Sequence, residues 1–136
     1  MKKLKLKAES LSDLEVIASA VQDSILRMNE IKYNQAGRYM TFRFLRFLNE
    51  SNSSARLQSG LRVDGVMSVR SRGLNTLDKN FMAVLLDINF TKKQSPAGII
   101  NFIFADQIEI QADVECIDMI LADLTDAKKT NKKPKH

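Results

Sequence analysis

Residues 99–125 read IINFIFADQIEIQADVECIDMILADLT, and the pattern of this stretch decides the expected fold. Large apolar residues occupy alternate positions in Ile99 to Phe104, and Ile108 to Ala112 alternates in the same way, so both segments are predicted strands. The spacing then changes to three and four residues. Five residues share that spacing: Val114, Ile117, Ile120, Leu121 and Leu124. This stripe predicts an amphipathic helix over Asp113 to Thr125 that closes the domain.

A second helix is predicted near the N-terminus, from about Asp13 to Asp23. Ser12 and Glu15 have the spacing of a capping box, in which each side chain bonds the backbone N–H of the other. The apolar stripe of this segment consists of Leu14, Ile17, Ala18 and Val21. The helix is therefore expected to pack on the domain through one face.

The chain between the two predicted helices indicates strands and turns. Strands are expected within residues 25–33, 38–48, 61–71 and 81–90, because β-branched and aromatic residues alternate there with polar ones. Asp64-Gly65 leaves two readings open: a two-residue hairpin turn, or a bend within one long strand.

These elements predict an α+β fold of about seven mostly antiparallel strands. The strands would form a bent sheet or partial barrel that the C-terminal helix closes, with an additional N-terminal strand and helix. This element order resembles the pleckstrin-homology superfold over about residues 25–125, and that resemblance implies a helix plugging one end of the barrel. A helix-packed open sheet is the alternative. Residues 1–127 would form a single domain and residues 128–136 a disordered tail.

The basic character of the chain belongs to its ends. The net charge is +5, but residues 1–7 and 128–136 hold nine lysines and no acid, which leaves 12 basic against 16 acidic residues between them. The lysines of the C-terminal tail are Lys128, Lys129, Lys132, Lys133 and Lys135. Such a tail can contact phosphates electrostatically, so weak binding of nucleic acid or an anionic surface is one possible function.

Residues that usually carry catalysis are scarce. The sole histidine, His136, is the last residue, and Cys116 is the sole cysteine, so a His-dependent triad and a thiolate or imidazole metal site are not expected. No nucleotide-binding or hydrolase motif is present. We therefore predict no catalytic residues, no metal and no cofactor. An enzyme that uses carboxylates alone ranks last among the candidate functions.

Three arginines form the candidate binding site. Arg62, Arg70 and Arg72 lie near Asp64-Gly65, and a hairpin there would place Arg62 and Arg70 on one sheet face. Arginine suits bidentate binding of phosphate or carboxylate, so this cluster predicts an anion site. The alternative is that acidic neighbours pair with the three arginines in ordinary surface ion pairs.

The chain also resembles an uncharacterised bacterial family of unknown function over nearly its whole length. Four segments carry the resemblance: Gly60 to Asp64, Val69 to Gly73, Asp113 to Ile117 and the lysine-proline ending. The resemblance implies a cytoplasmic bacterial protein of this size and supplies no site. The lack of an 18-residue apolar run predicts no membrane span. We expect a non-catalytic interaction or scaffold module that binds a protein partner or itself.

Overall fold

The computed structural model describes residues 4–47, 56–73 and 79–124. They form ten strands, one α-helix and one 3₁₀ helix: β1 (Lys5–Ala8), α1 (Leu11–Val21), β2 (Ser24–Arg27), η1 (Met28–Glu30), β3 (Ile31–Asn34), β4 (Tyr39–Phe47), β5 (Arg56–Asp64), β6 (Val66–Arg72), β7 (Met82–Lys92), β8 (Gly98–Phe104), β9 (Glu109–Val114) and β10 (Met119–Asp123). The predicted tail, residues 128–136, lies outside the described residues.

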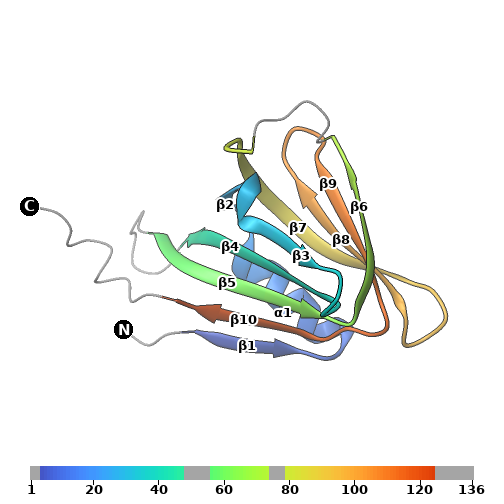
Figure 1. The fold of residues 1–136 in the computed structure, drawn as a ribbon. Coiled ribbons are helices and arrows are strands. Elements are labelled where there is room, and N and C mark those ends of the chain that lie inside the picture. The colour runs from blue at the N-terminus through green and yellow to red at the C-terminus, as the bar shows by residue number, and fades with distance from the viewer. Residues whose placement is uncertain (1–3, 48–55, 74–78, 125–136) are drawn as a thin grey trace, which may run out of the picture.

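All strands belong to one antiparallel sheet with the order β1-β10-β5-β4-β2-β7-β8-β9-β6, and β3 pairs with β4 off this path. The sheet curls, because β6 at its far end continues directly from β5 near its start (Figure 1). Gly65 makes this bend with a φ of 70°, a value that glycine adopts without steric cost. The link from β9 to β10 follows the bend, since Glu115 N donates to Gly65 O and Asp64 N donates to Asp118 O.

The curled sheet encloses the core, and α1 lies against its inner side (Figure 1). Phe42 of β4 meets Phe102 of β8 with ring centroids 4.5 Å apart, so the two halves of the sheet pack directly on each other. The helix buries the predicted stripe of Leu14, Ile17, Ala18 and Val21. The helix cap differs from the prediction: Ser10 accepts a hydrogen bond from Asp13 N, and Asp13 Oδ2 accepts one from Glu9 N.

The predicted C-terminal helix over 113–125 is wrong. Those of its residues that the structure describes belong to β9, a short link and β10, and the α-helix of the described chain is N-terminal. The stripe arises because two alternating strands are joined out of phase. Buried positions run through Ile110, Ala112 and Val114, shift by one residue in the link at Ile117, and resume at Met119 and Leu121. This mixture of two- and three-residue steps imitates helical spacing.

The predicted fold class therefore has to be corrected. Ten strands replace about seven, and the closing helix on which the pleckstrin-homology element order depends is absent from the described residues. At Asp64-Gly65, the bent strand is the correct reading. β5 pairs with β4 and β10 whereas β6 pairs with β9, so the two strands flanking Gly65 do not form a hairpin with each other.

Candidate functional site

The outer face of β1, β10, β5, β4 and β3 gathers basic side chains from strands far apart in the sequence. Two rows of neighbouring residues, which we name the cationic rows, cross these strands. The first row is Lys7–Ile120–Arg62–Thr41–Lys32, and the second is Lys5–Ala122–Gly60–Arg43. Together the rows hold five basic side chains and no acidic one. Strand register, rather than sequence spacing, brings these residues together.

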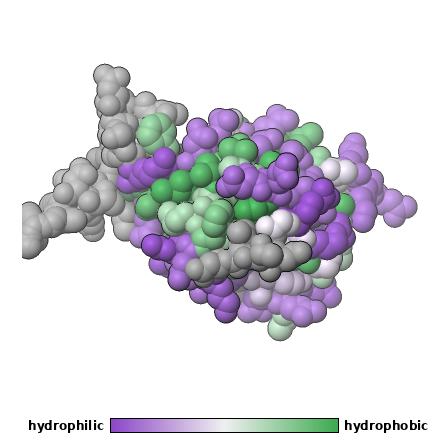
Figure 2. Space-filling view, turned by 90° about the horizontal axis from the view of Figure 1, so that it is seen from above, coloured by the Kyte–Doolittle hydropathy of each residue, from purple (hydrophilic) through white to green (hydrophobic). Residues whose placement is uncertain are grey.

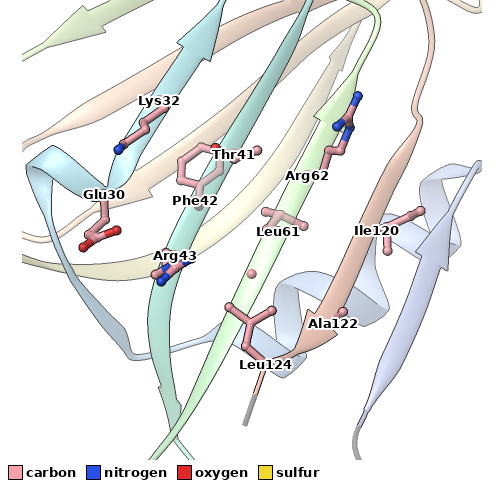
Figure 3. A pocket seen from close by; sticks show the side chains of 11 residues that line it. Glu30, Lys32, Thr41, Phe42, Arg43, Leu61, Arg62, Ile120, Ala122 and Leu124 are labelled. Atoms are coloured by element: carbon pink, nitrogen blue, oxygen red, sulfur yellow. The ribbon is translucent and has the colours of Figure 1, made fainter.

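A shallow groove of about 600 Å³ lies along the rows, and Lys32, Arg43 and Arg62 line it whereas Lys5 and Lys7 do not. Gly60 is also among its lining residues. Figure 3 shows Glu30, Lys32 and Arg43 on one side of the groove and Ile120 and Ala122 on the other. Leu124 lies over Gly60, with its nearest side-chain carbon 3.5 Å from the position a Cβ would take there. Within the part of the chain that the structure describes, Lys5, Lys32 and Arg43 have no acidic partner within ion-pair distance.

Arg62 is held in place on this face by two neighbours. Its Nε and Nη2 donate to the Asp64 carboxylate at 2.9–3.1 Å, and its guanidinium lies 4.0 Å from the centroid of the Tyr39 ring. The hydrogen bonds to Asp64 raise the pKa of Arg62 above its ordinary value. Its side chain is still 50% exposed, so the guanidinium is fixed in orientation and also accessible.

An apolar patch borders the second cationic row. Leu45, Ile25 and Val84 are register partners across β4, β2 and β7 and point away from the core, and Met82 lies two residues before Val84 on the same strand. Leu86 lies at the register shift that follows and lines a hollow beside α1. Leu45, Met82 and Leu86 are 38%, 45% and 40% exposed. Figure 2 shows apolar surface surrounded by hydrophilic residues on the face seen from above. Arg43 and Glu30 line both the groove and a smaller hollow of about 200 Å³ at this patch.

The structure separates the three arginines of the predicted anion site. Arg62 lies on the cationic rows, whereas Arg70 and Arg72 lie on β6, opposite Gln111 and Glu109 of β9. Arg70 Nη1 is 3.4 Å from Asp113 Oδ2, and Arg62 binds Asp64. The hairpin premise of the site is therefore wrong, while anion binding by these arginines stays a prediction.

The five tail lysines, Lys128, Lys129, Lys132, Lys133 and Lys135, lie outside the described residues. The last described residues before that segment are held to the first described residue. Leu4 N donates to Asp123 Oδ2 at 2.7 Å, and Asp123 N donates to Leu4 O at 2.9 Å. Both ends of the described chain therefore lie side by side at one end of the groove.

Asp123 is the most buried charged side chain near this site. Arg46 Nε and Nη2 each donate to its carboxylate at 3.1 Å, and Ser59 Oγ donates at 2.7 Å. Burial alone would raise the pKa of Asp123, but the hydrogen bonds from Arg46, Ser59 and Leu4 N outweigh it and hold the pKa below its ordinary value. This cluster ties β1, β4, β5 and β10 together, so its role is structural.

Sequence reasoning found Arg62 but missed Lys5, Lys32 and Arg43 as members of one cluster. The alternation of polar residues in β4 identifies Arg43 as outward-facing, yet its neighbours come from three other strands. Among the described residues, no group of three His, Cys, Asp or Glu side chains is placed to hold a metal ion.

The described helices include none that is long and apolar enough to cross a membrane. Comparison with the curated proteins and with the solved structures gives no match. Residues 4–136, nearly the whole chain, match a family described as a protein of unknown function, DUF2948. The family resemblance inferred from the sequence is thereby confirmed: the chain belongs to the DUF2948 family.

Proposed function

We propose that this protein is a non-catalytic cytoplasmic module that binds an acidic protein partner through the apolar patch around Leu45. The observation that supports this proposal is the row Leu45–Ile25–Val84, which crosses three strands on the outer face with Met82 beside it. Single exposed apolar residues are ordinary on protein surfaces, but a contiguous group with a polar rim is typical of an interaction site.

The charge around the patch selects the kind of partner. Arg27 and Arg43 line the hollow at its edge, and Glu30 is the one acidic residue that lines it. Arg56 also lies beside Leu45, since its Nη1 donates to Leu45 O. A second copy of the chain would bring these arginines against one another in a symmetric contact, and such like-charge contacts are unfavourable. An acidic surface complements them.

The test is affinity capture from an extract of the native cell with matched variants. Leu45→Asn removes the centre of the patch, and Val16→Asn makes a comparable change at an apolar residue of α1 that is 54% exposed. Burying a leucine side chain stabilises a contact by about 1.5–3 kcal/mol, so Leu45→Asn should weaken binding roughly 10-fold to 100-fold.

The proposal requires one acidic protein that the wild type and Val16→Asn retain and Leu45→Asn loses. Equal retention by all three proteins would refute it. Concentration-dependent self-association that Leu45→Asn abolishes would replace the acidic partner by a second copy.

A second candidate function is weak binding of nucleic acid or an anionic surface through the lysine-rich ends. The bonds between Leu4 and Asp123 favour it, because they hold together the two ends of the described chain, which adjoin the lysine-rich ends in the sequence. Full-length protein with all five tail lysines replaced by glutamine should then bind a labelled oligonucleotide more weakly, with a shallower salt dependence. Unchanged binding would reject this role for the tail.

A further inference from the structure

The cationic rows differ in charge from the other outer face of the sheet. Across β7, β8, β9 and β6 the outward positions include Asp87, Glu109 and Asp113 together with Arg70 and Arg72, so acids and bases are mixed there. The cationic rows contain basic residues alone among their charged positions. Concentration of Lys and Arg on one folded face is the electrostatic signature of nucleic-acid binding, and the overall charge of the chain conceals it here.

The spacing of the rows suits a single strand. Lys5 and Arg43 stand three strands apart, about 14 Å, and the two rows are about 7 Å apart along the strands. Between Lys5 and Arg43 the row holds only the small residues Ala122 and Gly60, and the Leu124 side chain lies over Gly60. Long basic side chains can reach inward from both sides to an extended phosphate backbone that crosses this stretch.

Arg62 and Tyr39 supply a place for a base. The guanidinium lies 4.0 Å from the Tyr39 ring on one side, and Asp64 holds its edge through Nε and Nη2. The Arg62 side chain is 50% exposed, so its guanidinium is accessible to a stacking partner. Flat guanidinium groups and aromatic rings are the usual stacking surfaces for unpaired bases. The carboxylate side chains of an acidic peptide do not stack on such a surface.

We propose that the cationic rows bind single-stranded nucleic acid without sequence preference, with phosphates on Lys5, Lys32 and Arg43 and a base stacked on Arg62. This site adjoins the apolar patch and shares Arg43 with its edge, but it does not depend on the proposed protein partner. The nearby acids limit its strength: Glu9 pairs with Lys7, Asp64 pairs with Arg62, and Glu30 lines the groove. The three cations without an acidic partner among the described residues, Lys5, Lys32 and Arg43, should give a plot of the logarithm of the binding constant against the logarithm of the salt concentration with a slope of about −2.

The experiment measures fluorescence anisotropy of a labelled oligothymidylate of about 15 nucleotides, titrated with full-length protein at several salt concentrations. Lys32→Gln/Arg43→Gln should weaken binding roughly 10-fold at low salt and make the slope shallower by about 1.4. Arg62→Lys keeps the charge and removes the flat stacking surface, so it should weaken binding several-fold with no change in slope. Lys92→Gln/Lys93→Gln removes two charges at the end of β7 and should behave as wild type.

Thermal melting of each variant separates a binding defect from loss of the fold. If Lys32→Gln/Arg43→Gln binds as tightly as wild type, or if Lys92→Gln/Lys93→Gln weakens binding equally, the site is refuted. If Arg62→Lys has no effect, or polyglutamate competes as well as the oligonucleotide, the face is a general anion surface and the nucleic-acid assignment is overturned. Tighter binding of duplex than of single strand would overturn the stacking role of Arg62.

Discussion

Replacing Asp123 by Asn should destabilise the fold severely, because it leaves the buried Arg46 without its counter-charge. The side chains of Arg46 and Asp123 are 12% and 1% exposed, and both guanidinium contacts to the carboxylate measure 3.1 Å. The amide nitrogen of asparagine cannot accept a hydrogen bond from Arg46, so at least one of these contacts is lost. Removing one partner of a buried ion pair costs about 3–5 kcal/mol.

This loss is measurable as the free energy of unfolding from urea denaturation at pH 7. Asp64→Asn is the matched control, because its partner Arg62 is 50% exposed and exposed ion pairs contribute about 0–1 kcal/mol. A loss for Asp123→Asn that equals the loss for Asp64→Asn would refute the reasoning, since burial would then make no difference.

Three further outcomes follow from the same geometry. Because the pKa of Asp123 is lower in the folded protein, its contribution to stability is complete above its unfolded pKa of about 3.9 and is lost as pH falls through the folded pKa. Acidification should therefore lower the free energy of unfolding more in the wild type than in Asp123→Asn. Parallel curves of unfolding free energy against pH would contradict this. Gly65→Ala should lower the free energy of unfolding, measured by urea denaturation, by about 1–2 kcal/mol, because φ is 70° at this position. The nearest atom is 3.8 Å from the added Cβ, so the cost comes from the backbone conformation and not from a clash. An unchanged denaturation midpoint would exclude strain at the bend. Ser68→Ala should raise the pKa of Asp113, whose largest cause of depression is the Ser68 hydroxyl, and an unaltered NMR titration would count against that hydrogen bond.

Local patterns in the sequence were sufficient for α1 and for most strands. The stripe of α1 was identified residue by residue, because a helix fixes its buried face through its own 3.6-residue period. The strand at Ile99–Phe104 was equally clear, since alternation over six residues sets one face.

Long-range pairing decided what the sequence left open or obscured. The link between β9 and β10 has no local signal of its own, and its position depends on contacts with Asp64 and Gly65 about 50 residues earlier. Asp123 falls within the segment that was wrongly predicted as a helix, and the arginine that neutralises it, Arg46, lies 77 residues away in the sequence. Asp123 is a polar residue at a buried position of β10, and it breaks the alternation that would have identified β10 as a strand.

The candidate site was only partly predictable for the same reason. Arg62 was selected from its neighbourhood in the sequence, but Lys5, Lys32 and Arg43 join it through the register of five strands. Charge counted along the chain gave a body that is slightly acidic overall. Charge counted by sheet face gives one face with two rows whose charged residues are all basic and one face of mixed charge, and this distinction requires the topology.

Site-specific photo-crosslinking in the native cell tests the proposed interaction surface most directly. A photoreactive amino acid is placed at Leu45 or Met82 of the apolar patch, and at Leu11 or Val16 of α1 as exposed apolar controls. We expect both patch positions to crosslink to the same acidic protein, and we expect no such crosslink from the two α1 positions. Crosslinks of equal yield from all four positions, or an adduct from α1 alone, would contradict it.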